Sequence, residues 1–240
     1  MSTDPVVIVA ARRTPIGAFQ GALSDVSATE LGATAVAAAV ADSGVEPADF
    51  GRVLMGCVLP AGLGQAPARQ AALGGGLPKG VPCATVNKMC GSGMEALVLA
   101  HDMIVAGSVG IAVAGGLESM TNAPYLMPKA RKGYRMGHQE VLDHMFYDGL
   151  QDTYEGHMMG HYAEATSQKY GFSREDQDAF AIESVTRATR AAGDGSFDAE
   201  IVPVTVKTRR GEHTVSVDEV PGTVSVDKIP NLRPAFAKDG

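Results

Sequence analysis

The chain has no tryptophan and only three cysteines among its 240 residues. The cysteines are odd in number and show no Cys-x-x-Cys spacing, which argues against a disulfide framework or a zinc site and favours a reducing compartment. The first residues lack the basic start and apolar run of a signal peptide. No uninterrupted apolar stretch approaches the roughly 20 residues that a membrane-spanning helix needs. These absences predict a cytoplasmic protein with no membrane partner and no metal.

Basic residues are fewer than acidic ones: 20 Lys and Arg against 27 Asp and Glu give a formal net charge of −7 at pH 7. This balance gives no general attraction to nucleic acid or to an anionic membrane. The charged residues are unevenly spread: residues 1–118 hold 15 Asp, Glu, Lys and Arg residues, and residues 119–240 hold 32. The shift predicts two domains, 1–118 and 119–240.

Apolar runs and helical patterns alternate through residues 1–118. Ser27 and Glu30 form a capping-box pattern that opens an alanine-rich helix ending near Gly44. Strands are expected at 6–9, 53–58, 81–86 and 111–114, and further helices at 67–73 and 94–107. Strands this apolar are covered on both faces, so the pattern predicts an α/β fold with a mostly parallel sheet and helices on each side.

Residues 119–240 have a different character. The stretch 125–160 has no clear period and many glycines and methionines. Ser173 and Asp176 predict a capped helix that runs to about residue 192. Apolar and polar residues alternate at 201–209 and 213–217, which predicts a hairpin that turns at Arg210 and Gly211. This part is therefore expected to be a mixed α+β domain.

Cys90 is the strongest candidate for chemistry. It lies in the turn Asn-Lys-Met-Cys-Gly-Ser-Gly, residues 87–93, between an apolar strand and a long helix. The free N–H groups and the dipole of a helix N-terminus favour an anion, and therefore thiolate over thiol. Glycines let another molecule approach the backbone closely. The pattern predicts a nucleophile for covalent catalysis; the alternative is a small buried thiol in a tight turn.

Residues 86–96, Val-Asn-Lys-Met-Cys-Gly-Ser-Gly-Met-Glu-Ala, resemble the acyl-accepting cysteine segment of the thiolase family, most closely that of acetyl-CoA acetyltransferases. Residues 9–17, 115–125 and 231–236 resemble other family segments, in family order. The resemblance implies a thiolase-like layered fold in which residues 119–240 form an inserted loop domain that covers the sheet and holds coenzyme A.

The resemblance also implies an activity. Thiolases form or thiolyse 3-ketoacyl-CoA, for example acetoacetyl-CoA from two acetyl-CoA, through an acyl group on the cysteine that matches Cys90. Coenzyme A is then a substrate or product, and no further cofactor is expected. Family members are homodimers or homotetramers, and their chemistry belongs to fatty acid metabolism.

Three family elements have no match in these residues. They are a Gly-His-Pro histidine that activates the nucleophile, a Cys-x-Gly cysteine that serves as acid and base, and an Asn-Glu segment that orients water. The sequence has no His-Pro pair and no cysteine after Cys90. We therefore expect the C-terminal catalytic half to be absent and the chain to be incomplete for turnover.

The resemblance implies three substrate contacts. Leu150 matches a position that touches the tail of coenzyme A, and Phe236 matches one near its adenine. Met158 falls where short-chain thiolases carry the histidine of a His-Met-Gly motif. That difference leaves open a 3-ketoacyl-CoA thiolase of longer chain length. Core packing explains Leu150 and Phe236 almost equally well.

Other patterns leave alternatives open. Lys129, Arg131, Lys132 and Arg135 face either the phosphates of coenzyme A or only solvent. His157 and His161 have the i, i+4 spacing of metal ligands, but no third ligand follows at a suitable spacing. Two other classes stay open: a related condensing enzyme, such as a ketoacyl synthase or a hydroxymethylglutaryl-CoA synthase, and a non-catalytic half-protein that binds coenzyme A or a partner.

Overall fold

A parallel sheet of three strands is the centre of the fold. The computed structural model describes residues 6–209 and 211–240. The central strand is β1 (Arg52–Gly56), with β2 (Cys83–Val86) on one side and β3 (Ala112–Gly116) on the other. Gly56 pairs in register with Val86 and with Gly116, so all three strands end at one edge of the sheet.

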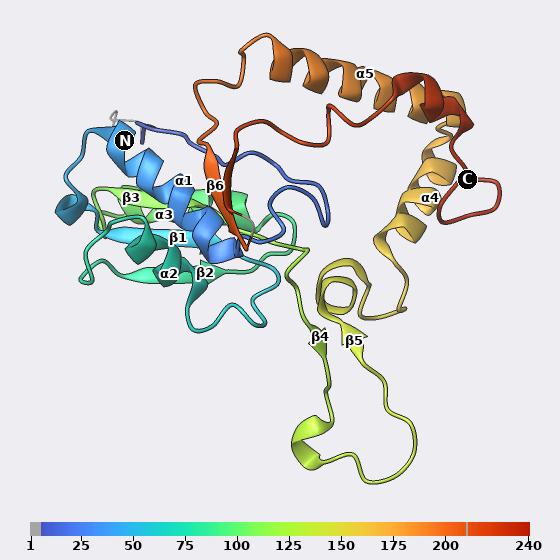
Figure 1. The fold of residues 1–240 in the computed structure, drawn as a ribbon, viewed down its shortest axis with the longest axis horizontal. Coiled ribbons are helices and arrows are strands. Elements are labelled where there is room, and N and C mark those ends of the chain that lie inside the picture. The colour runs from blue at the N-terminus through green and yellow to red at the C-terminus, as the bar shows by residue number, and fades with distance from the viewer. Residues whose placement is uncertain (1–5, 210) are drawn as a thin grey trace.

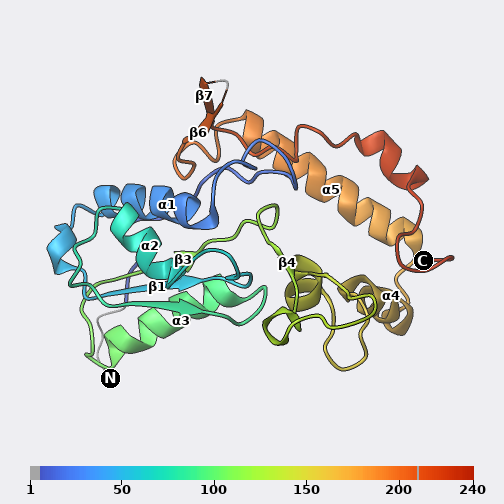
Figure 2. The ribbon, with the colours of Figure 1, turned by 60° about the horizontal axis from the view of Figure 1, so that its bottom comes forward.

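Helices cover both faces of this sheet (Figures 1 and 2). Helices α1 (Ala28–Ser43) and α2 (Pro67–Gly74) pack together on one face, and α3 (Ser92–Val105) lies on the other. Successive side chains of a strand point to opposite faces. Val53 and Met55 of β1 accordingly join the core under α1 and α2, whereas Leu54 packs with Ala96 and Ala100 of α3. The predicted α/β class is confirmed.

The helix ends follow local signals. Ser27 and Glu30 form a complete capping box at the start of α1, and Gly44 ends the helix with a left-handed φ of 66°. Helix α3 begins at Ser92, two residues before the predicted start. Its first turn is therefore closer to Cys90 than the sequence suggested.

The predicted strand at 6–9 is wrong. No strand is assigned there, and Val7, Ile8 and Val9 are 62% to 78% exposed. A strand needs a neighbour for its N–H and C=O groups, and no strand in the described part of the chain pairs with this segment. An apolar run in the sequence does not show whether a partner strand is available.

An extended arm and three helical segments follow the sheet. Strands β4 (Tyr125–Leu126) and β5 (Leu142–Asp143) form the base of an arm that projects from the body and carries the short helix η2 (Ala130–Lys132) (Figure 1). The π-helix η3 (Met145–Leu150) comes next. Helices α4 (Met159–Tyr170) and α5 (Arg174–Gly193) complete this part, and the predicted cap of α5 at Ser173 is confirmed.

The chain then returns to the first part of the fold. The predicted hairpin is present as β6 (Val204–Thr208) and β7 (Gly211–Val215); Arg210, at its predicted turn, lies outside the described residues. The hairpin buries Val204, Val206 and Val215 against Leu23 and Val26. The short helices η1 (Pro47–Asp49) and η4 (Val226–Asn231) complete the elements.

No helix in residues 6–209 and 211–240 combines the length and apolarity needed to cross a membrane. The proposed boundary between 118 and 119 stays a prediction.

Candidate active site

Glycines bring the first turn of α3 directly against the ends of two strands. A Cβ on Gly56, the last residue of β1, would lie 2.5 Å from the carbonyl carbon of Ser92 and 2.6 Å from the nitrogen of Gly93. A Cβ on Gly116, the last residue of β3, would lie 3.6 Å from the Cα of Gly93. The distances at Gly56 are too short for any Cβ, so only glycine permits this approach there, whereas a Cβ on Gly116 would be in ordinary contact. Cys90, two residues before α3, is thereby placed at the carboxyl edge of the sheet.

Side chains hold the turn that carries Cys90, residues 87–92 (the Cys90 turn). Ser92 is only 4% exposed. Its hydroxyl oxygen accepts the N–H of Lys88 at 2.8 Å and donates to the carbonyl oxygen of Met89 at 2.5 Å. The Asn87 side-chain oxygen accepts the N–H of Met89 at 2.9 Å. Met89 has a φ of 50°, a left-handed conformation that is uncommon for a residue with a side chain.

The backbone N–H of Cys90 is free within this network. The N–H of Gly91 donates to the carbonyl of Lys88 at 3.2 Å, and the N–H of Ser92 donates to the carbonyl of Met89 at 2.9 Å. In the part of the chain that the structure describes, the N–H of Cys90 has no acceptor. A donor is therefore available beside the thiol.

Cys90 is exposed and lines a cavity of about 450 Å³ between the Cys90 turn and η3. Most of the wall is apolar, and it includes Leu59, Leu117, Met120, Met145 and Leu150. Of the described residues, Cys90 and Glu118 are the titratable ones in the lining. Such a cavity suits an apolar group attached to the sulfur of Cys90.

Glu118 ties the end of β1 to the end of β3. One of its oxygens accepts the N–H of Val58 at 2.7 Å, and the other accepts the N–H of Leu59 at 3.1 Å. The thiol of Cys57 lies 3.7 Å from the same carboxylate. The sequence did not predict that Glu118 is an acceptor, because Val58 and Leu59 are about 60 residues away in the chain.

The other two thiols lie in different surroundings. Burial, together with the negative charge of Glu118, raises the pKa of Cys57 to about 12. Burial also raises the pKa of Cys83. Both groups are therefore held as neutral thiols near pH 7, and neither lines the cavity.

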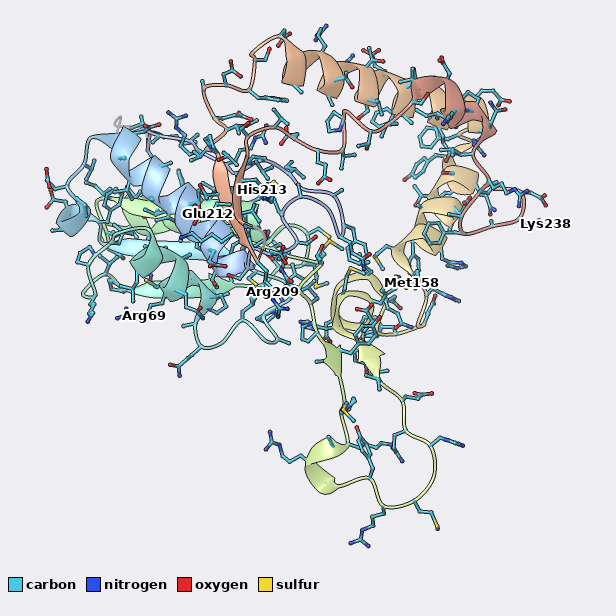
Figure 3. All side chains as sticks on the ribbon, in the orientation of Figure 1. Arg69, Met158, Arg209, Glu212, His213 and Lys238 are labelled. Carbon is cyan, nitrogen blue, oxygen red and sulfur yellow. The ribbon has the colours of Figure 1, made fainter. Side chains whose placement is uncertain are left out.

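The structure brings one of the three predicted substrate contacts to Cys90. Leu150, the last residue of η3, lines the same cavity. Met158 immediately precedes α4 (Figure 3), and Phe236 packs its ring over Gly160, where a Cβ would lie 2.1 Å from the ring. Neither Met158 nor Phe236 is among the described residues of the cavity lining. Their roles stay predictions.

His144 was not predicted, although it supports the wall of the cavity. It is 4% exposed and directly precedes η3. Its Nε2 accepts the N–H of Ala61 at 3.4 Å, so the ring proton is on Nδ1, which donates to Asp148 at 2.6 Å. The contact fixes η3, which carries Met145 and Leu150, to the loop after β1.

The histidine pair noted in the sequence is stacked. The ring centroids of His157 and His161 are 4.0 Å apart. No group of three or more His, Cys, Asp and Glu residues with a metal-binding arrangement occurs in residues 6–209 and 211–240. The positive residues of the arm, Arg131 and Lys132, lie in η2, and both are exposed.

Comparison with known proteins shows the family of this chain. Residues 6–240 match the family model "Thiolase, N-terminal domain". The chain is 50% identical over 237 residues to proteins named "Probable acetyl-CoA acyltransferase" from Staphylococcus aureus strains COL and MRSA252. The match covers 98% of this chain and 60% of each relative. The chain therefore belongs to the thiolase family.

Proposed function

We propose that Cys90 accepts an acyl group from an acyl-coenzyme A thioester. The thiolate attacks the carbonyl carbon, the new carbon–sulfur bond forms, and coenzyme A leaves as a thiolate with the electron pair of the broken bond. The observation that carries the proposal is an exposed thiol at the start of α3 that lines an apolar cavity.

The free N–H of Cys90 supports the same step. The carbonyl oxygen of the substrate becomes negative when sulfur attacks, and a donor fixed in advance stabilises that charge. The N–H groups of Lys88, Met89, Gly91 and Ser92 have acceptors inside the turn, whereas the N–H of Cys90 is left to donate to a substrate.

The relatives' name and the family resemblance extend this step to a full reaction. In it, the acyl group on Cys90 joins the carbanion of acetyl-CoA to give a 3-ketoacyl-CoA, or a 3-ketoacyl-CoA is thiolysed by free coenzyme A. Removing a proton next to a thioester carbonyl needs a positioned base. By resemblance, that base is a second cysteine with no counterpart in these 240 residues. We propose that this chain performs the acylation but not complete turnover.

The coenzyme A contacts are part of the proposal. Leu150 contacts the tail that leads to Cys90, Met158 lies beside the acyl group, and Phe236 lies near the adenine. Leu150 has support from its place in the cavity wall. Met158 and Phe236 rest on the resemblance alone.

Trapping the acyl group tests the proposal. The purified chain is incubated with acetyl-CoA, quenched in acid and mapped by mass spectrometry. We expect one acetyl group, on the peptide that contains Cys90, and none in the Cys90→Ala variant. Acetylation of Cys83 or of lysines alone, or no acetylation, would contradict the proposal. Steady thiolysis of acetoacetyl-CoA by the chain alone would contradict the claim of incomplete turnover.

The cavity favours a second candidate, a thiolase of longer acyl chains. Its wall includes three methionines, Met89, Met120 and Met145, whose flexible side chains adapt to different shapes. The test is the rate at which N-alkylmaleimides of increasing chain length modify Cys90. A rate that rises with chain length in the native chain, and levels off early in a Met145→Phe variant, supports the longer-chain candidate. A rate that does not depend on chain length contradicts it, and Met136→Phe, at a methionine that is 92% exposed, is the matched control.

A further inference from the structure

We infer that Ser92 is a positioning residue for Cys90: its buried hydroxyl locks the Cys90 turn in the shape that points the thiol at the acyl carbon and the free N–H at the carbonyl oxygen of the same acyl group. The inference rests on the proposed function, because it concerns the geometry of acylation. It assigns a role to a residue that lines the cavity but carries no charge and is not the nucleophile.

The first step of the argument is burial. Ser92 is 4% exposed in a part of the molecule where Met94, Leu97 and Val98 of the same helix are exposed. A buried hydroxyl without partners is costly, and this one has both of its roles filled. It accepts the N–H of Lys88 and donates to the carbonyl of Met89, so it spans the Cys90 turn from the residue before Met89 to the start of α3.

The second step is the conformation that these bonds hold. Met89 is left-handed, with φ of 50°, and a non-glycine residue in that region persists only when its surroundings fix it. The carbonyl of Met89 accepts the hydroxyl of Ser92 at 2.5 Å and the N–H of Ser92 at 2.9 Å, and the N–H of Met89 donates to Asn87. Met89 directly precedes Cys90, so its dihedral angles set the direction of the N–H of Cys90.

The third step is the support below the turn. The backbone of Ser92 and Gly93 lies directly on Gly56, so the hydroxyl of Ser92 is anchored to the sheet. The thiol is consequently fixed to a rigid element through Ser92. Without the hydroxyl, Met89 relaxes toward an ordinary conformation, and the N–H of Cys90 turns away from the oxygen that it should stabilise.

The experiment compares acylation with alkylation at the same sulfur. Acylation by acetyl-CoA develops a negative oxygen that needs the N–H of Cys90, whereas alkylation by iodoacetamide displaces iodide and develops none. Removing one oxyanion donor costs about 100-fold or more in other enzymes, so partial misalignment in Ser92→Ala is expected to slow acetylation at least roughly tenfold. Alkylation is expected to change less than about threefold, since the sulfur itself remains exposed.

Ser43 provides a matched control. Its hydroxyl donates to the carbonyl of Val40 at 2.7 Å and accepts the N–H of Val45 at 3.1 Å, the same pair of bonds at the end of α1. Ser43→Ala therefore loses comparable interactions without touching the Cys90 turn. It is expected to shift the urea midpoint and to leave the ratio of acetylation to alkylation unchanged.

A second variant covers the case in which Ser92→Ala does not fold. Asn87 is exposed, and Asn87→Ala removes the acceptor for the N–H of Met89. It is expected to lower the ratio of acetylation to alkylation in the same direction. Acetylation of both variants at the native rate, or an equal fall of acetylation and alkylation, would overturn the role of Ser92. The proposed function of Cys90 would be unaffected by that result. Failure of the native chain to be acetylated while its Cys90 is alkylated would instead overturn the proposed function.

Discussion

Three thiols in this chain meet three different environments. Cys57 is buried beside the carboxylate of Glu118, and Cys83 is partly buried in the edge strand β2. Cys90 is exposed at the start of a helix and lines a cavity. The same functional group is consequently inert at two positions and available for chemistry at the third.

Glu118 holds the loop after β1 through its two carboxylate oxygens. Glu118→Gln replaces one of two acceptor oxygens with an NH₂ group, so the N–H of Val58 or of Leu59 loses its partner. An unsatisfied buried donor costs about 1 to 3 kcal/mol, and we expect a loss of that size in the free energy of unfolding. Urea denaturation measures it. Glu46→Gln, at an exposed glutamate, should stay within about 0.5 kcal/mol of the native chain, and an equal effect of both changes would contradict this role of Glu118.

At the scale of elements, the site depends on how closely α3 approaches the ends of β1 and β3. The contact is made by backbone on backbone, through Gly56, Gly93 and Gly116. The parallel sheet supplies the shared edge, and the helix supplies the N-terminus that points at it. Moving the helix outward by the size of a methyl group moves Cys90 with it.

Gly56→Ala tests this contact. The new Cβ would meet the backbone of Ser92 and Gly93 at 2.5 to 2.6 Å, and backbone has no way to rotate aside. We expect a loss of about 1 to 3 kcal/mol in the free energy of unfolding and a slower acetylation of Cys90. Gly110→Ala is the control, because nothing lies within 4 Å of its Cβ position. Native stability and native acetylation in Gly56→Ala would show that α3 does not depend on this approach.

At the scale of the whole molecule, an ion pair joins the beginning of the chain to its last quarter. Arg13 donates two hydrogen bonds to Asp218, at 2.7 and 3.0 Å, and a third to Glu200 at 2.5 Å. Asp218 also accepts the N–H of Ile16 at 2.8 Å. The bonded guanidinium of Arg13 holds the pKa of Asp218 below its ordinary value of 3.8.

That lowered pKa predicts a pH dependence. A carboxylate with a lowered pKa in the folded state stabilises the fold above its ordinary pKa, and the stabilisation is lost as the pH falls through the lowered value. Asp218→Asn should therefore be less stable than the native chain at pH 7, and the difference should vanish as the pH falls well below 3.8. Thermal unfolding across this range measures it. A difference that is the same at pH 7 and in strong acid would contradict the ion pair as its cause.

The outer side of α3 is a large apolar surface. Met94, Leu97, Val98 and Val105 are between 47% and 70% exposed. Exposed apolar patches of this kind promote association. We expect the mass measured by light scattering to rise with concentration and to fall back toward one chain in a Leu97→Glu and Val98→Glu variant. Phe180→Glu on α5, where the ring is 79% exposed, is the control; a monomer at all concentrations would contradict the prediction.

The sequence predicted what local signals decide. The capping boxes at Ser27 and Ser173 and the left-handed Gly44 act within a few residues, and the helices α1 and α5 begin or end there. Cys90 could be predicted as a nucleophile because Gly91 and Gly93 follow it closely in the chain. Helix α4 was missed because none of its residues is buried, so it has no apolar stripe to detect.

Contacts between distant residues were beyond the sequence. The segment 6–9 looks like a strand in composition, but strand formation depends on a partner elsewhere. The acceptor role of Glu118, the bonds of Ser92 and the support from His144 each depend on groups that only the folded chain brings together. Met158 and Phe236 are outside the cavity wall among the described residues, and their contacts with coenzyme A stay predictions from the resemblance.

Competition among the three thiols for a limiting amount of iodoacetamide at pH 7 tests the central claim most directly. Cys90 should be modified first and alone, because it is exposed at a helix N-terminus while burial raises the pKa of Cys57 to about 12 and also that of Cys83. Mapping the modified peptides by mass spectrometry over time gives the three rates. Equal slow modification of all three thiols, or Cys83 ahead of Cys90, would contradict the assignment of Cys90 as the acyl acceptor.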